Sequence, residues 1–288
     1  MFYGILLAIL TGLCWTSFGI ILSFTARKKL DVILFGIIQN FCCMVLALIF
    51  FVKWQNFSWA AAIPILPYVL TAGILNATGQ YITKCAMQYG HNGLAWAISQ
   101  SSMVIPFITG VLFFQQKSSL WQYAGVILML ATILLPNLTV KRQNGKWLTA
   151  SLTAFMIFGI VQTLYLILSL RGISDPINLR PALAAMGMIV GWSGISAITR
   201  HRFEVQKSLI FTGGTMSLIS ITSLVLFFLT LDKLSQLQLG NIAIPLMIGS
   251  NICAFTLYSI FTIREKNSWK EYLTVAALLL GLVLMTVS

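Results

Sequence analysis

The sequence reads FFQQKSSLWQYAGVILMLATILL at residues 113–135 and FTIREKNSWKEYLTVAALLLGLVLMT at residues 261–286. Each stretch contains a polar pair, a lysine, a polar turn, a tryptophan and a tyrosine, followed by a long apolar segment. Lys117 corresponds to Lys266, and the two tryptophans correspond after a gap of one residue. One stretch ends near the middle of the chain and the other near its end, so the pattern predicts two related halves.

The composition assigns both halves to a membrane. Of the 288 residues, 58% are hydrophobic and 8% are charged, whereas about a quarter of a soluble domain is charged. Basic residues exceed acidic ones by 18 to 6, but they occur singly or in short groups between long apolar runs. This pattern excludes a soluble enzyme or a nucleic-acid-binding protein. It predicts a polytopic protein whose partners are the lipid bilayer and a small-molecule substrate.

Ten segments are apolar and long enough to cross a bilayer, which takes roughly 20 residues in a helix. They lie near residues 3–24, 33–52, 62–84, 93–114, 119–138, 148–170, 180–199, 208–231, 238–262 and 269–287. The expected fold is therefore an all-α integral membrane protein with ten transmembrane helices. Because five crossings are an odd number, the halves at 1–140 and 144–288 should be two five-helix inverted repeats, an architecture of many secondary transporters.

The distribution of Lys and Arg predicts how these helices are oriented. The loops after the first, third, fifth, seventh and ninth segments hold 13 basic residues, namely Arg27, Lys28, Lys29, Lys84, Lys141, Arg142, Lys146, Arg200, Arg202, Lys207, Arg264, Lys266 and Lys270. The other loops hold 5, namely Lys53, Lys117, Arg171, Arg180 and Lys233. Cytoplasmic loops are enriched in basic residues, so we expect both termini outside, in a multi-pass protein of a bacterial inner (plasma) membrane.

Two stretches carry a resemblance to a known family. The first runs from Ala86-Met87-Gln88-Tyr89-Gly90 through Pro106 to Gln116-Lys117, and the second from Leu231-Asp232-Lys233-Leu234-Ser235 to Glu265-Lys266. Their order and duplication resemble the drug/metabolite transporter superfamily, specifically its ten-helix EamA-like branch. One departure is Gln115-Gln116, where the family usually has Gly-Glu. The resemblance implies a transporter with a central cavity lined by the first, third, fourth, sixth, eighth and ninth helices.

A finer resemblance is to the rhamnose–proton symporter and related sugar-uptake members of that superfamily. It rests on Arg27-Lys28-Lys29, directly after the first segment, and on Asn76, Gly79, Tyr81 and Met87 in the third. This resemblance implies a sugar-like cargo and coupling to protons or sodium.

Polar side chains inside the predicted helices recur at helical spacing. The candidate substrate-binding residues are Trp15, Asn76, Gln80, Tyr81, Lys84, Trp96, Ser99, Gln100, Gln162, Tyr165, Asn241 and Asn251. In hydrocarbon, such side chains mark either a transport pathway or a hydrogen bond between helices. Lys84 either extends to the cytoplasmic interface or supplies a charge for an anionic group. The Gln39-Asn40 pair could serve either role.

The predicted helices lack the charged groups that other mechanisms need. All six carboxylates and both histidines fall in loops or at helix ends. A transporter that exchanges organic cations for protons generally needs a buried carboxylate, so a cationic-drug pump is disfavoured. We predict a small polar cargo that is neutral or zwitterionic and sugar-like, with an amino-acid or nucleoside exporter or exchanger as the alternative. Facilitated diffusion or exchange is the simplest mechanism, and coupling to protons or sodium stays open.

Prolines mark the parts of the helices that are expected to move. Pro64, Pro67, Pro106 and Pro245 fall inside predicted helices, where proline removes a backbone hydrogen bond and bends the helix. Pro106 and Pro245 are the candidate gating residues of an alternating-access cycle.

An intramembrane enzyme is the rival from a different class. It would need a Ser–His pair, paired aspartates or a metal cluster within the spans. The predicted helices hold no histidine, and no carboxylate away from their ends. The five cysteines lie in or beside apolar segments without CxxC spacing, as packing residues do. We expect no catalytic residue, no cofactor and no metal site, and either a monomer or a homodimer.

Overall fold

The structure is a computed structural model that describes residues 1–28, 31–89, 92–138, 145–173, 175, 177–203, 207–258 and 269–287. Several residues named above lie outside these ranges, namely Lys29, Gly90, Lys141, Arg142, Arg264, Glu265 and Lys266. The expected boundary between the halves, near 140–144, and the polar start of the second repeated stretch also lie outside the described residues.

Every regular element among the described residues is a helix, so the prediction of an all-α protein is confirmed. The α-helices are α1 (Phe2–Lys28), α2 (Val32–Phe50), α3 (Trp59–Ala62), α4 (Leu66–Tyr89), α5 (Asn92–Gln100), α6 (Val104–Phe114), α7 (Leu120–Leu138), α8 (Gly145–Leu170), α9 (Arg180–Thr199), α10 (Lys207–Gln236), α11 (Gly240–Tyr258) and α12 (Trp269–Thr286). Two short 3₁₀ helices complete the set, η1 (Trp54–Asn56) and η2 (Ser101–Met103).

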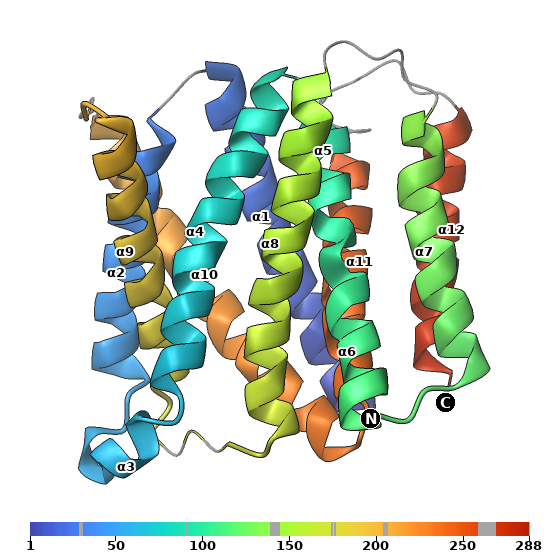
Figure 1. Cartoon of the computed structure of the whole chain (residues 1–288), viewed down its shortest axis with the longest axis horizontal. Coiled ribbons are helices and arrows are strands. Elements are labelled where there is room, and N and C mark those ends of the chain that lie inside the picture. Colours follow the sequence, from blue (N-terminus) through green and yellow to red (C-terminus); the bar gives the residue numbers. More distant parts are fainter. Residues whose placement is uncertain are drawn as a thin grey trace.

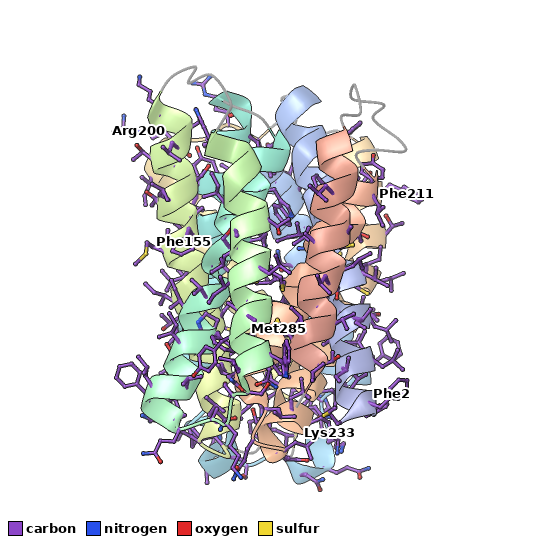
Figure 2. All side chains as sticks on the ribbon, turned by 90° about the vertical axis from the view of Figure 1, so that its right-hand side faces the viewer. Phe2, Phe155, Arg200, Phe211, Lys233 and Met285 are labelled. Carbon is purple, nitrogen blue, oxygen red and sulfur yellow. The ribbon has the colours of Figure 1, made fainter. Side chains whose placement is uncertain are left out.

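Length and exposed surface place the helices in a membrane. Among the described residues, five helices are long and apolar enough to cross one, and several shorter helices are also apolar. Large apolar side chains point outward along the bundle, including Phe2 at 80% exposure and Phe211 at 75% (Figure 2). A soluble protein of this size would not expose so many, so the outer surface of the bundle suits lipid.

The helices stand side by side in one bundle, with α7 and α12 paired at one edge and α2 and α9 at the opposite edge (Figure 1). Both termini lie at the end of the bundle that also holds α3 (Figure 1). Arg200 and Lys233 lie at opposite ends (Figure 2). Between the edges, α4 packs against α8 and α9, α1 packs against α10 and α11, and α2 packs against α9 and α10.

The structure corrects the expected helices at three of the four prolines. The segment 93–114 is not one helix, because η2 separates α5 from α6 just before Pro106. Proline has no backbone N–H and clashes with the carbonyl four residues earlier, which here is that of Ser102 in η2. Pro64 lies in the turn between α3 and α4, and Pro67 lies in the first turn of α4, so neither interrupts a helix. Pro245 does lie inside α11, as predicted.

Glycines allow α4 and α9 to approach each other closely. A Cβ atom on Gly187 would lie 2.5 Å from the carbonyl oxygen of Leu70, and one on Gly73 would lie 2.6 Å from that of Ala184. Both distances are shorter than van der Waals contact, and the atoms in the way belong to the backbone. Only glycine therefore permits this helix crossing, which is a common solution in membranes.

The variant Gly187→Val should separate α4 from α9 and destabilise the protein by about 1–3 kcal/mol through overpacking. Gly194 provides a matched control on the same helix, because no atom lies within 4 Å of a Cβ added there. We expect the purified Gly187→Val protein to melt at a lower temperature in detergent micelles, and Gly194→Val to melt like the wild type. Equal melting temperatures for the two variants would contradict the close packing of α4 on α9.

Candidate functional site

A partly open cavity of about 120 Å³ lies between the helices of the bundle. Its lining comes from α1, α2, α4, α5, α8, α9, α10 and α11. The lining residues are Trp15, Phe18, Gln39, Asn40, Asn76, Gln80, Trp96, Gln100, Phe158, Val161, Gln162, Tyr165, Met188, Ser220, Ser223, Leu224, Phe227 and Asn251. The mixture of amides, hydroxyls and aromatic rings is suited to binding a small polar molecule.

The structure brings eight of the twelve candidate residues together in this cavity. They are Trp15, Asn76, Gln80, Trp96, Gln100, Gln162, Tyr165 and Asn251. They come from five separate helices. The sequence identified them one helix at a time, and the structure places them around the same cavity.

The other four candidates lie outside the lining. The ring of Tyr81 packs edge-on against Trp192, with ring centroids 6.4 Å apart. Ser99 donates to the carbonyl of Ala95 and accepts from Thr83. Asn241 donates to the hydroxyl of Ser118 at 2.5 Å. Lys84 lies half-buried near the end of α4. Their roles in substrate binding stay predictions.

Ten lining residues were not among the candidates, and the largest group lies on α10. Ser220, Ser223, Leu224 and Phe227 are spaced by three and four residues, which places them on one face of the helix. That spacing is visible in the sequence, but serine is so common in membrane helices that it gives little signal. Gln39 and Asn40 of α2 also line the cavity, in keeping with one of the two roles considered for that pair.

Hydrogen bonds to other groups of the protein hold several polar side chains of the lining in place. Gln39 donates to the hydroxyl of Ser220 at 2.7 Å and so joins α2 to α10. Gln162 donates to the hydroxyl of Ser102 at 3.1 Å and joins α8 to η2. Asn40 bonds within its own helix, to the carbonyl of Gly36 at 2.8 Å. These bonds fix the shape of the cavity wall before any molecule enters.

Aromatic rings form another part of the wall. Phe227 lies between Trp15 and Tyr165, with ring centroids 5.4 Å from each. Tyr165 also packs edge-on against Phe228 at 5.5 Å. Separations of this size allow the attractive edge-to-face arrangements of aromatic pairs. The cluster gives the cavity a rigid apolar surface beside its amide groups.

Comparison with known proteins shows a likeness to one family over the first part of the chain. Residues 2–138 match the model of the EamA-like transporter family. The predicted resemblance to the EamA-like branch is confirmed over these residues. The family consists of membrane transporters of the drug/metabolite transporter superfamily, not of enzymes.

No curated protein matches the chain. A solved structure whose title reads "Crystal structure of protein" is similar to it, with a TM-score of 0.69 and 11% sequence identity. The alignment covers 99% of this chain and 98% of that chain. At this identity the likeness shows a shared fold, and it extends through the second half of the chain, beyond the family match.

The described charged groups of the protein do not line the cavity. Arg180, at the start of α9, pairs with Asp232 of α10 at 2.9 Å. Near the opposite end of α9, His201 Nε2 lies 3.0 Å from the carboxylate of Asp31, which caps α2 by accepting from two backbone N–H groups. None of the lining residues carries a full charge. Within the described residues, His, Cys, Asp and Glu form no cluster suited to a metal ion.

Proposed function

We propose that the protein is a secondary transporter that moves a small, polar, sugar-like metabolite by alternating access through the central cavity. The observation that carries the proposal is the chemistry of the lining, in which amides, hydroxyls and aromatic rings occur without a charged group. Amides and hydroxyls can both donate and accept hydrogen bonds. Aromatic rings stack on flat or ring-shaped molecules.

The size of the cavity supports a small cargo. Its volume of about 120 Å³ is below the roughly 300–1,000 Å³ typical of sites for drug-sized ligands. It is close to the ~150 Å³ of an engineered protein cavity that holds benzene. A molecule with a single ring therefore fits better than a multi-ring drug.

The lining favours an uncharged cargo over a zwitterionic one. An amino acid brings a carboxylate and an ammonium group, and burying an unpaired charge is costly. One of the two roles considered for Lys84 was to pair with a carboxylate, but Lys84 does not line the cavity. The cavity lining therefore offers no positive charge to pair with the carboxylate of an amino acid.

Two inverted five-helix repeats would explain how such a site opens to either side in turn. In this scheme α1, α2, α4, α5–α6 and α7 correspond to α8, α9, α10, α11 and α12. If each helix is replaced by its counterpart, the pair α4 and α8 becomes α10 and α1, and the pair α4 and α9 becomes α10 and α2. The pair α1 and α11 becomes α8 and α5–α6. All of these pairs are in contact, which supports the repeat.

Pro106 and Pro245 remain the proposed hinges of the cycle. Pro106 is the third residue of α6, which begins where η2 ends. Ser102 of η2 accepts a hydrogen bond from Gln162 in the cavity wall. A change in the backbone at η2 would therefore move a cavity wall. We place the transporter in a bacterial inner membrane with the end that carries both termini outside.

A thermal-shift screen tests the proposed cargo class. Purified protein is heated with sugars, nucleosides, amino acids or organic cations, because a ligand that binds the folded state raises the melting temperature. We expect uncharged sugars or nucleosides to stabilise the protein. Stabilisation by a permanent cation alone would refute the proposal.

A further inference from the structure

We infer that Asn251 is the specificity-determining residue of the cavity, where it binds a hydrogen-bond donor and an acceptor lying side by side on an uncharged ring. This inference rests on the proposed transport function and narrows it to a class of cargo. It is carried by the buried polar atoms of the lining that the protein itself leaves without partners.

Asn251 is held firmly at the cavity. It is 1% exposed and lies on α11 where that helix crosses α1. Its backbone carbonyl accepts from the hydroxyl of Thr16 at 3.4 Å. At the same crossing, a Cβ on Gly12 would lie 2.2 Å from the carbonyl oxygen of Met247. The backbone of α11 is thus fixed against α1 directly beside the Asn251 side chain.

The Asn251 side chain itself is unpaired. In the part of the chain that the structure describes, neither Nδ2 nor Oδ1 has a hydrogen-bond partner, although both are buried. Buried amides normally find partners, and an unpaired one is costly. By contrast, Gln39, Asn40 and Gln162 each donate an N–H to another group of the protein. Both polar atoms of the Asn251 side chain therefore remain available to a ligand.

Two further lining atoms extend this set. Trp96 Nε1 is a buried donor, and Gln162 Oε1 is a buried acceptor, and neither has a partner among the described residues. Together with Asn251, they offer two donor groups and two acceptor groups in one cavity. A cargo that pairs with them must itself carry both donors and acceptors. A simple cation or anion could satisfy only half of the set.

A primary amide pairs best with a donor and an acceptor that are adjacent, as in bidentate recognition of a base edge. A lactam edge and a vicinal diol both provide this arrangement. The aromatic surface of Trp15, Tyr165 and Phe227 then suits the flat or ring face of the same molecule. The shared chemistry is an uncharged single ring with a donor and an acceptor side by side on its edge.

Uracil, which has a lactam edge, and glucose, which has vicinal hydroxyls, distinguish the two sources of that chemistry. Each is titrated into the purified full-length protein by calorimetry, with alanine and tetramethylammonium as charged probes. We expect at least one of the two uncharged probes to bind and the charged probes not to bind. Binding of a charged probe alone would overturn the proposed function as well as this inference.

The variant Asn251→Leu separates the inference from the function. We expect it to weaken binding of the uncharged probe about tenfold to a hundredfold, the effect of losing one or two buried hydrogen bonds. The unliganded variant should melt at or above the wild-type temperature, because the substitution removes two unpaired buried atoms. A residue with a purely structural role would show the opposite change in melting temperature.

Asn241 provides a matched control, because it is a buried amide of the same helix that lies outside the cavity and bonds to Ser118. The variant Asn241→Leu should bind the probe within about twofold of the wild type. If the wild type binds the probe and Asn251→Leu binds it equally well, the inference is wrong while the proposed function stands. A lower melting temperature of unliganded Asn251→Leu would also overturn the inference.

Discussion

Replacing Asp232 with alanine should lower the free energy of unfolding by about 3–5 kcal/mol, the cost of leaving a buried charge without its partner. The Arg180 side chain is 3% exposed, and its Nη1 atom donates to both carboxylate oxygens of Asp232 at 2.9 and 3.1 Å. Its Nη2 atom donates to the carbonyl of Ile173, and its guanidinium lies 5.7 Å from the ring centroid of Phe228. The pair therefore connects the α8–α9 loop, α9 and α10.

The two partners should not be equally costly to remove. The Asp232 side chain is 37% exposed and also accepts from Ser169 at 2.6 Å. In Arg180→Met the carboxylate would still reach water and Ser169, so we expect a loss of about 1 kcal/mol. In Asp232→Ala the guanidinium stays buried, and Asp175 lies 3.8 Å away from its Nε atom, already accepting from two backbone N–H groups. Asp232→Ala should therefore be the more destabilising variant.

Equilibrium unfolding in detergent micelles measures this asymmetry. The double variant Arg180→Met/Asp232→Ala should recover most of the stability that Asp232→Ala loses, because it removes the unpaired charge. Lys233→Ala serves as the control, since Lys233 is exposed and adjacent to Asp232. A larger loss for Arg180→Met than for Asp232→Ala would show that the burial of Arg180 does not govern this site.

The variant Ser223→Trp should reduce transport to the level of protein-free vesicles. Ser223 is 2% exposed, lines the cavity and donates only to the carbonyl of Ser220 in its own helix. Replacing Ser223 therefore removes no hydrogen bond between helices. An indole ring at this position would occupy much of a cavity of about 120 Å³ and exclude the cargo. The expected effect is therefore on transport far more than on stability.

Thr222 gives a matched control for this substitution. It is the preceding residue of α10, but its side chain is exposed on the outside of the bundle. Uptake into proteoliposomes should persist in Thr222→Trp and vanish in Ser223→Trp, at equal amounts of folded protein. Equal uptake by the two variants would mean that the cargo does not pass through the cavity.

Much of the cavity could be predicted from the sequence, because polar residues spaced by three and four must share a helix face. Asn76 and Gln80 of α4, and Gln162 and Tyr165 of α8, were found in this way and lie in the lining. Spacing along a helix does not give depth in the bundle. Lys84 lies on the same face of α4 as Asn76, two steps of four residues later. At 1.5 Å per residue it is about 12 Å farther along the helix axis, and it lies beyond the cavity.

Other features depend on which helices meet, and a single sequence does not contain that information. Asn241 and Asn251 are the same residue type on the same helix, but only Asn251 reaches the cavity. The partner of Arg180 is 52 residues away in the sequence, and Arg180 was read only as a loop charge that reports orientation. A bend at Pro106 was predicted, but the full break between α5 and α6 was not, because the apolar pattern continues across η2.

The central claim is that an uncharged polar solute crosses the membrane through this cavity, and uptake by proteoliposomes tests it most directly. Vesicles that contain the wild-type protein are supplied in parallel with labelled glucose, uracil, alanine and tetramethylammonium, and protein-free vesicles give the background. The account predicts uptake of glucose or uracil above background, and no uptake of alanine or tetramethylammonium. Uptake of a charged solute without uptake of either uncharged one would contradict it.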